Sequence, residues 1–273
     1  MPQSFTIRRD RLPDRLFGKR SVLVTGAAGN IGLYFAEHSS SRYALRLMVH
    51  QEGEIEKLKK WGEVVVADLS DIERLQQHCQ GIDTVVHLAA DPSPKAEWES
   101  LLPANIVGTY NMMMAALQAG CRRVIYASSI HAVMGNPVDV QSRTSDPVNP
   151  GDLYGVTKCF GEALGRYLAG QKGLSVIALR IGAFQPIEAA QRPEGLSMLD
   201  IFVSQRDLNQ LIEKCIDDPM LQWAIFNGLS DNRFKRLDIS DARELVGYAP
   251  QDDLTQENLL IKSLHLKETV NSR

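Results

Sequence analysis

A tyrosine and a lysine four residues apart, Tyr154 and Lys158, are the side chains of this sequence whose types and spacing best suit chemistry. Residues four apart share one face of a helix, so a phenol and an ammonium at this spacing can point into one cleft. Opposite charges about 4 Å apart at an effective dielectric constant of ~20 interact by roughly 4 kcal/mol, which lowers a phenol pKa by about three units. The pair predicts a tyrosine that acts as a base near neutral pH.

A glycine-rich turn far upstream is the second feature with a chemical use. Three glycines stand between an apolar β-rich run and an amphipathic helical pattern: Gly26, Gly29 and Gly32. At such a turn the first glycine permits the tight bend, the second lets backbone N–H groups approach a pyrophosphate, and the third lets helix and strand pack closely. The turn predicts a dinucleotide site, against the plainer alternative of an ordinary strand-to-helix connection.

Alternating patterns along the chain indicate the elements that would position these residues. Apolar β-rich runs alternate with helical patterns, which predicts a parallel sheet with helices on both faces. The expected strands are 22–24, 45–49, 63–66, 84–88, 123–127 and 175–179, and the expected helices are 30–40, 54–61, 71–79, 98–119 and 152–170. After residue 180 we expect a long polar loop through 191–195, a helix capped by Ser204, a strand at 222–226 and a short helix at 240–245.

Together these elements predict an α/β fold of the Rossmann type, a doubly wound parallel sheet with a small C-terminal part. We divide the chain into an N-terminal extension (1–20), a dinucleotide-binding domain (21–180) and a C-terminal part interleaved with the sheet (181–273). A chain of 273 residues suits one such domain with a small appendage. The extension carries no predicted role, and packing on the sheet and disorder are both open for it.

Composition and charge argue against several classes of partner. A net charge of −3 supplies no basic field for nucleic acid. The four cysteines are scattered without metal-ligand spacing, which predicts no metal site and free thiols in a reducing compartment. No run of 18 apolar residues predicts a membrane span, and residues 1–20 lack the apolar core of a secretory signal. We therefore expect a cytoplasmic protein.

The glycine turn, Ser129 and the segment from Tyr154 to Lys158 resemble the extended short-chain dehydrogenase/reductase family, which carries TGxxGxxG, a serine and YxxxK. The similarity covers nearly the whole chain after residue 20. Segments 127–131, 153–162 and 180–182 look most like uronate dehydrogenases and related NAD(P)-dependent sugar or sugar-phosphate dehydrogenases. In this family the part corresponding to 181–273 binds substrate, and the helices at 98–119 and 152–170 pair two subunits. The resemblance therefore implies a homodimer.

The resemblance also implies roles for individual residues. Tyr154 would be the base, Lys158 would keep it acidic and bind the nicotinamide ribose, and Ser129 would hold the substrate oxygen. The family spacing favours Ser129 over the competing Ser128. The implied cofactor contacts are Gly26, Gly29, Asn30, Ile31, Gly32, His50, Asp68, Leu69, Leu88, Ala89, Ala90, Tyr154, Lys158 and Ile181, and the implied substrate contacts are Ser93, Ser129, His131 and Arg192.

Some of these roles compete with a plain structural role. Asn105 matches a family asparagine that supports the lysine through water, or it serves helix packing alone. Asp68 matches an acid that contacts the adenine amine, or it begins the next helix. His131 binds substrate or is a packed histidine. Arg192, like Arg206, supplies a cation to the pocket or is simply solvated.

The sequence departs from the family pattern at the cofactor ribose. NAD-specific relatives carry an acid at the end of the second strand, which accepts hydrogen bonds from the ribose 2′-OH and repels a 2′-phosphate. This chain has His50 there, which favours NADP slightly over NAD, although Glu52 and Glu54 are near enough to replace the missing acid. His50 is otherwise an exposed residue at a strand end.

A second departure from the family pattern lies in the residues that bind a sugar carboxylate. Uronate dehydrogenases carry Asn-His after the serine and an arginine before a Met-Leu pair. This chain has Ile130 in place of the asparagine and Ser197 in place of the arginine.

The resemblance predicts oxidation of the C1 hydroxyl of a cyclic sugar, sugar phosphate or sugar acid to a lactone. Alternatives are a nucleotide-sugar epimerase, disfavoured by the short C-terminal part, and a non-catalytic NADP-sensing regulator, disfavoured by the intact Tyr154 and Lys158.

Overall fold

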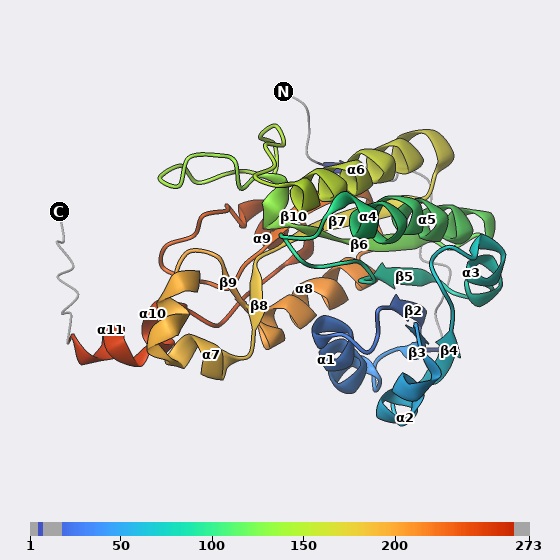
Figure 1. The fold of residues 1–273 in the computed structure, drawn as a ribbon, viewed down its shortest axis with the longest axis horizontal. Helices are drawn as coiled ribbons and strands as arrows, with labels where there is room; N and C mark the ends of the chain where they lie inside the picture. Colours follow the sequence, from blue (N-terminus) through green and yellow to red (C-terminus); the bar gives the residue numbers. More distant parts are fainter. Residues whose placement is uncertain (1–4, 8–17, 265–273) are drawn as a thin grey trace.

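The structure, a computed structural model, describes residues 5–7 and 18–264, and an eight-stranded sheet forms its centre (Figure 1). The strand order is β1-β10-β7-β6-β5-β2-β3-β4, and neighbouring strands are parallel except for β1 and β10. The strands are β1 (Phe5–Ile7), β2 (Ser21–Thr25), β3 (Ala44–Val49), β4 (Glu63–Val66), β5 (Thr84–His87), β6 (Arg123–Ser129), β7 (Ser175–Ile181) and β10 (Leu221–Gly228). The predicted fold class is confirmed.

Helices cover both faces of this sheet (Figure 1). One face carries α1 (Asn30–Ser39), α2 (Ile55–Leu58) and α8 (Gln205–Asp217), and the other carries α3 (Ile72–His78), α5 (Gly108–Gln118) and α6 (Leu153–Tyr167). β7 is buried along its whole length, as expected of a parallel strand with helices on both sides. Within the described residues, no helix is long and apolar enough to cross a membrane.

The strand order reverses between β2 and β5. From β2 the chain moves outward through β3 to β4, and then returns to β5 on the other side of β2. In sheets of this kind, ligands bind beyond the carboxyl ends of the strands at the reversal point. The turns after β2, β3, β5 and β6, which carry most of the predicted site residues, therefore end at one edge of the sheet.

Two helix predictions are wrong in detail. The helix expected at 98–119 is divided into α4 (Trp98–Leu101), a wider π-helical turn (Leu102–Val107) and α5. Pro103 lies in that turn, and a proline has no N–H group to continue the α-helical hydrogen bonds. The helix expected at 54–61 is reduced to α2, which follows a 3₁₀ turn at Glu52–Glu54.

The C-terminal part holds more structure than expected. The predicted loop through 191–195 is largely α7 (Ile187–Gln191) and a 3₁₀ turn (Pro193–Met198), and a small parallel sheet joins β8 (Ala183–Gln185) to β9 (Phe202–Ser204). Ser204 caps α8 as predicted, because its Oγ accepts from the Asp207 N–H. The remaining helices are α9 (Ser240–Val246), α10 (Leu254–Glu257) and α11 (Leu259–Ser263).

Both ends of the chain contribute to the architecture around the sheet. β10, from the C-terminal part, lies beside β7 in the main sheet, and β1 pairs with the other side of β10. Residues 5–7 of the expected extension therefore pack on the sheet. The rest of that segment up to residue 17, and residues 265–273, lie outside the described residues.

Candidate active site

The predicted tyrosine and lysine lie together on α6, at the carboxyl end of β6. Asp152 caps this helix, with Oδ1 accepting from the Gly155 N–H at 2.7 Å. Tyr154 and Lys158 are both buried, and Lys158 Nζ donates to the Ala127 carbonyl oxygen at 2.8 Å. Ser129, the last residue of β6, forms a hydrogen bond with Tyr154. The structure thus brings Ser129, Tyr154 and Lys158 into one place.

The two serines at the end of β6 face different partners. Ser128 Oγ donates to Glu162 Oε1 at 2.6 Å, and Glu162 is paired with Arg180 through contacts of 2.9 and 2.8 Å. Glu162 and Arg180 are buried, so Ser128 is held by an ion pair inside the protein. Ser129, rather than Ser128, has its side chain at Tyr154.

The expected lowering of the Tyr154 pKa is wrong for this structure. Burial raises the pKa of Tyr154, and this effect outweighs the lowering by the hydrogen bond with Ser129. Burial also lowers the pKa of Lys158 to about 8, because the protein interior disfavours the charged ammonium. The sequence estimate counted the attraction between two charges and left out the cost of burying each of them.

His131 contacts both the tyrosine and the cap of its helix. His131 Nδ1 lies 2.6 Å from Asp152 Oδ2, and the His131 and Tyr154 rings meet edge to face with centroids 5.4 Å apart. An aspartate just before a helix is a readable N-cap signal, but its contact with a histidine 21 positions away is not. Sequence reasoning therefore missed Asp152.

A cavity of about 270 Å³ contains these groups. Its lining includes Ser128, Ser129, His131, Tyr154 and Lys158, together with the mainly apolar residues Ile31, Leu88, Ala90, Pro92, Ala127, Ile130, Ile181, Gly182, Ala183, Phe184 and Ile201. The side chains of Phe184 and Ile201 come from the region of β8 and β9, which sequence reasoning treated as loop. Within the described ranges, no three His, Cys, Asp or Glu side chains are grouped as a metal site.

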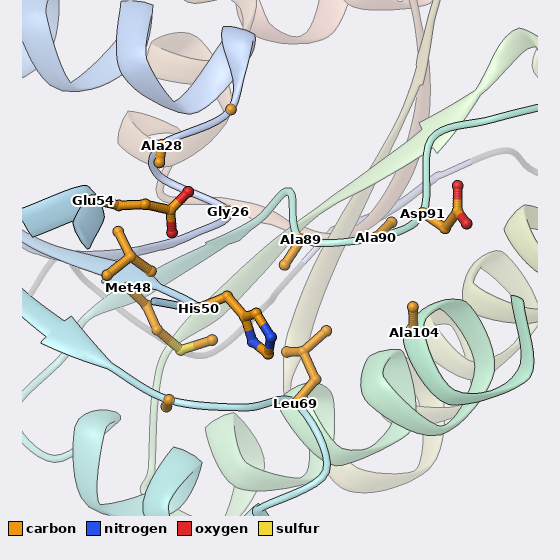
Figure 2. Close-up of a pocket in the computed structure, with 13 residues that line it drawn as sticks. Gly26, Ala28, Met48, His50, Glu54, Leu69, Ala89, Ala90, Asp91 and Ala104 are labelled. Atoms are coloured by element: carbon orange, nitrogen blue, oxygen red, sulfur yellow. The ribbon is translucent and has the colours of Figure 1, made fainter. Parts of the chain in front are cut away.

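A second cavity of about 470 Å³ lies along the glycine turn (Figure 2). Ala90 lines both cavities, so the two adjoin. Gly26 has a φ of +64°, and a Cβ there would lie 2.9 Å from the Ala89 nitrogen, while a Cβ on Gly32 would lie 2.5 Å from the Gly26 carbonyl oxygen. Only glycine fits these two positions without strain.

The start of α1 is suited to an anion. Gly29 is its N-cap residue and makes no side-chain cap, and the first turn carries no acidic residue. The first N–H groups of a helix without such a cap can bind a phosphate, and the helix dipole favours the negative charge. Glycine turn, helix start and cavity therefore fit the pyrophosphate and nucleoside of a dinucleotide. Asn30 lines a separate cavity between α1 and residues 184–186.

Several predicted cofactor residues line this cavity (Figure 2). The lining includes Gly26, Gly29, His50, Leu69, Ala89 and Ala90 from the predicted set, together with Ala28, Met48, Val49, Glu54, Ala67, Asp91 and Ala104. Asp68 is exposed, lies outside the lining residues and has Oδ2 3.5 Å from His50 Nδ1. Asp71, not Asp68, caps α3, so the alternative role for Asp68 as the start of that helix is wrong.

Asn105 joins two parts of the site without a direct contact to Lys158 among the described residues. It lies in the π-helical turn, where Oδ1 accepts from the Asp91 N–H at 2.7 Å and Nδ2 donates to the Asp91 carbonyl oxygen at 3.0 Å. The same Nδ2 donates to Thr157 Oγ1 at 3.1 Å, next to Lys158. Ser93 and Arg192 are exposed and line neither cavity, so the structure does not bring them to Tyr154.

Comparisons with known proteins show the family of this chain. Residues 22–185 match the model of the NAD dependent epimerase/dehydratase family. The chain is 35% identical over 252 residues to the NAD-dependent glucose-6-phosphate dehydrogenase of Haloferax volcanii, covering 85% of this chain and 93% of that protein. It is 34% identical over 251 residues to the L-arabinose 1-dehydrogenase (NAD(P)(+)) of the same organism, covering 85% and 96%.

A solved structure of a sugar-acid dehydrogenase is similar to this chain over most of its length. The uronate dehydrogenase from Agrobacterium tumefaciens superimposes with a TM-score of 0.78 at 31% identity, covering 93% of this chain and 92% of that one. The resemblance to NAD(P)-dependent dehydrogenases predicted from the Tyr-Lys pair and the glycine turn is confirmed. With more than half of its length matched by the family model, the chain belongs to the NAD-dependent epimerase/dehydratase family.

Proposed function

We propose that this protein oxidises the C1 hydroxyl of a cyclic sugar, sugar phosphate or sugar acid to a lactone, with NAD or NADP as the second substrate. One observation carries the proposal: Ser129, Tyr154 and Lys158 share a cavity that adjoins the glycine-turn cavity through Ala90. The names of the relatives support a sugar as substrate.

The residues at the site suit alcohol oxidation. Ser129 Oγ would hold the substrate oxygen, and Tyr154 would take the hydroxyl proton as general base. Because burial raises the pKa of Tyr154, the phenolate needs the nearby Lys158 ammonium as well as the Ser129 hydrogen bond. Lys158 would also bind the nicotinamide ribose, and Asn105 would support it through the Thr157 turn. When bound, the nicotinamide supplies the acceptor for the hydride.

The substrate cavity favours a small sugar. Its volume of about 270 Å³ lies just below the usual range of roughly 300–1,000 Å³ for small-molecule sites. This size speaks against the alternative of a nucleotide-sugar epimerase. Ile130 lines the cavity and Ser197 does not, so the two groups that grip a carboxylate in uronate dehydrogenases have no counterpart there. Neutral aldoses and sugar phosphates are therefore the proposed substrates.

Two side chains act on the cofactor ribose in opposite directions. His50 supplies no negative charge at the end of β3, which favours NADP. Glu54 points its side chain into the same cavity, where a carboxylate would accept from ribose hydroxyls and repel a 2′-phosphate (Figure 2). We propose that the enzyme accepts both cofactors and binds NADP at least as well as NAD.

The proposed homodimer would form on the face made by α5 and α6. These helices lie side by side on one face of the sheet (Figure 1). Large apolar side chains are exposed there, among them Tyr110 on α5 and Val156 on α6, each 46% exposed. Covering them with a second copy of the chain would remove apolar surface from water.

A substrate screen tests the proposed function. Aldoses, uronates, sugar phosphates and nucleotide-sugars are each offered with NAD and with NADP, nicotinamide absorbance is followed, and the product is identified. Reduction of the nicotinamide with lactone formation supports the proposal. Net conversion of a nucleotide-sugar without net reduction would indicate the epimerase, and cofactor binding with no turnover of any of these compounds would indicate the regulator.

A further inference from the structure

Asp152 connects the catalytic helix to His131 through its two carboxylate oxygens. Oδ1 accepts from the Gly155 N–H at 2.7 Å and caps α6, while Oδ2 lies 2.6 Å from His131 Nδ1. The two backbones also touch, because a Cβ on Gly155 would lie 2.3 Å from the His131 carbonyl oxygen. The first turn of α6 and the turn that carries His131 (Ile130–Ala132) therefore form one packed unit.

The contact with Asp152 determines which nitrogen of His131 carries the proton. A carboxylate only accepts hydrogen bonds, so Nδ1 must be the donor and the neutral ring presents an unprotonated Nε2. Nε2 has no hydrogen-bond partner within residues 5–7 and 18–264, and it is not among their buried unpaired atoms. His131 lines the substrate cavity and its side chain is 23% exposed, so this free acceptor is accessible to a ligand there.

We propose that Asp152 is a positioning residue that holds His131 in the Nδ1–H tautomer, so that Nε2 accepts a hydrogen bond from a substrate hydroxyl and disfavours a carboxylate at that place. This inference rests on the proposed function and names a specificity device within it. A hydroxyl can donate to Nε2, whereas a carboxylate has no proton to give and would face a lone pair. The neighbouring Ile130 has no side-chain amide that could donate to the carboxylate instead.

The Asp152→Asn variant separates this role from helix capping. An asparagine still caps α6 through its amide oxygen, but its NH₂ group would face His131 Nδ1 and require the ring to carry its proton on Nε2. Nitrogen-15 NMR of the six histidines, with the His131 signals assigned from a His131→Gln variant, reports the tautomer directly. We expect Nδ1–H in the wild type and Nε2–H in Asp152→Asn.

Kinetics provide the second measurement. For the neutral aldose with the highest kcat/KM, Asp152→Asn should leave both KM and kcat within about twofold, because a hydroxyl can donate to a bare Nε2 or accept from Nε2–H. The corresponding uronate should gain relative to that aldose, because Nε2–H can donate to its carboxylate. The matched control is Asp71→Asn at the cap of α3, which should change neither the His131 signals nor the KM.

Three results would overturn the inference. These are an Nε2–H tautomer in the wild type, an unchanged tautomer in Asp152→Asn, and a changed tautomer with an unchanged aldose-to-uronate ratio. If the wild type oxidises no sugar at all, the proposed function fails and with it the claim about selection. The NMR measurement then still decides whether Asp152 positions His131, so the two failures are distinguishable.

Discussion

Lys158 Nζ lies 5.3 Å from the centre of the Tyr154 ring, over its face. The ammonium is buried and donates to one described protein group, the Ala127 carbonyl oxygen. It is therefore held close to the phenol but at a cost, since burial lowers the Lys158 pKa to about 8. The protein keeps a partly desolvated cation at the place where a phenolate would need one.

Replacing this lysine should stabilise the cofactor-free protein at neutral pH. Burial lowers the Lys158 pKa from the usual 10.5 to about 8, a shift equivalent to about 3 kcal/mol. Below pH 8 the free energy of unfolding of the wild type is lower by this amount, because the native state must bury the charge. Between pH 8 and 10.5 the unfolded chain binds more protons than the native one, so wild-type stability rises with pH and the loss disappears. Lys158→Met should therefore unfold at higher denaturant at pH 7.

Denaturant unfolding from pH 7 to 10.5 measures this difference, which should shrink as the pH rises. Lys57→Met, at an exposed position on α2, is the control and should show no such convergence. A Lys158→Met protein that is less stable than the wild type at pH 7 would contradict the buried charge. The same variant should also lose both turnover and cofactor affinity.

Tyr154→Phe should retain the fold and cofactor binding and lose turnover by roughly 10²–10⁴-fold, the usual contribution of a positioned proton-transfer group. Only the phenolic oxygen that bonds with Ser129 disappears. Steady-state turnover and cofactor titration are the measurements. Tyr167→Phe removes an exposed phenol from the same helix and should leave both unchanged. More than half of wild-type turnover in Tyr154→Phe would show that another group is the base.

Cofactor preference should respond in opposite directions to two substitutions. His50→Asp adds an acceptor for the ribose 2′-OH and repels a 2′-phosphate, so it should shift the ratio of dissociation constants toward NAD. Glu54→Gln removes a charge from the same cavity and should shift it toward NADP, each by about tenfold or more. Glu56→Gln, outside the cavity, is the control. Wild-type protein that binds NAD tenfold tighter than NADP would make Glu54 the dominant acid.

The kcat/KM should be higher for neutral aldoses or sugar phosphates than for uronates. Each missing charge-assisted hydrogen bond to a carboxylate is worth about 1.5–3 kcal/mol, or roughly ten- to a hundredfold in efficiency. Kinetics with glucose, glucose 6-phosphate and glucuronate test this. Efficient oxidation of glucuronate with the other two sugars inert would show that another group replaces the missing contacts.

The oligomeric state should depend on the face formed by α5 and α6. A Tyr110→Glu, Val156→Glu double variant places two charges on this exposed apolar surface and should convert a dimer into a folded monomer. Light scattering coupled to gel filtration gives the mass, and Val138→Glu, in an exposed loop, should remain a dimer. A wild-type monomer, or a double variant that stays dimeric, would exclude this interface.

Features with a strong local signal were predictable from sequence. Strands buried on both faces, such as β7, are continuous apolar runs, and Gly26 and Gly32 were recognisable from their spacing between a strand and a helix. Contacts between distant segments were not predictable, which is why the Asp152–His131 pair was missed. The Tyr154 pKa was predicted in the wrong direction because burial, which decides its sign, cannot be read from a spacing of four residues.

The contact at Gly155 limits how this enzyme can change shape. A helix start pressed against the His131 backbone leaves no room for the two to slide, so Tyr154, Ser129 and His131 should move as one rigid block. Closure around a substrate would then fall to other segments that line the cavity, such as the small β8–β9 region that holds Phe184 and Ile201. Changes in that region could alter which sugar is accepted while the proton-transfer geometry stays the same.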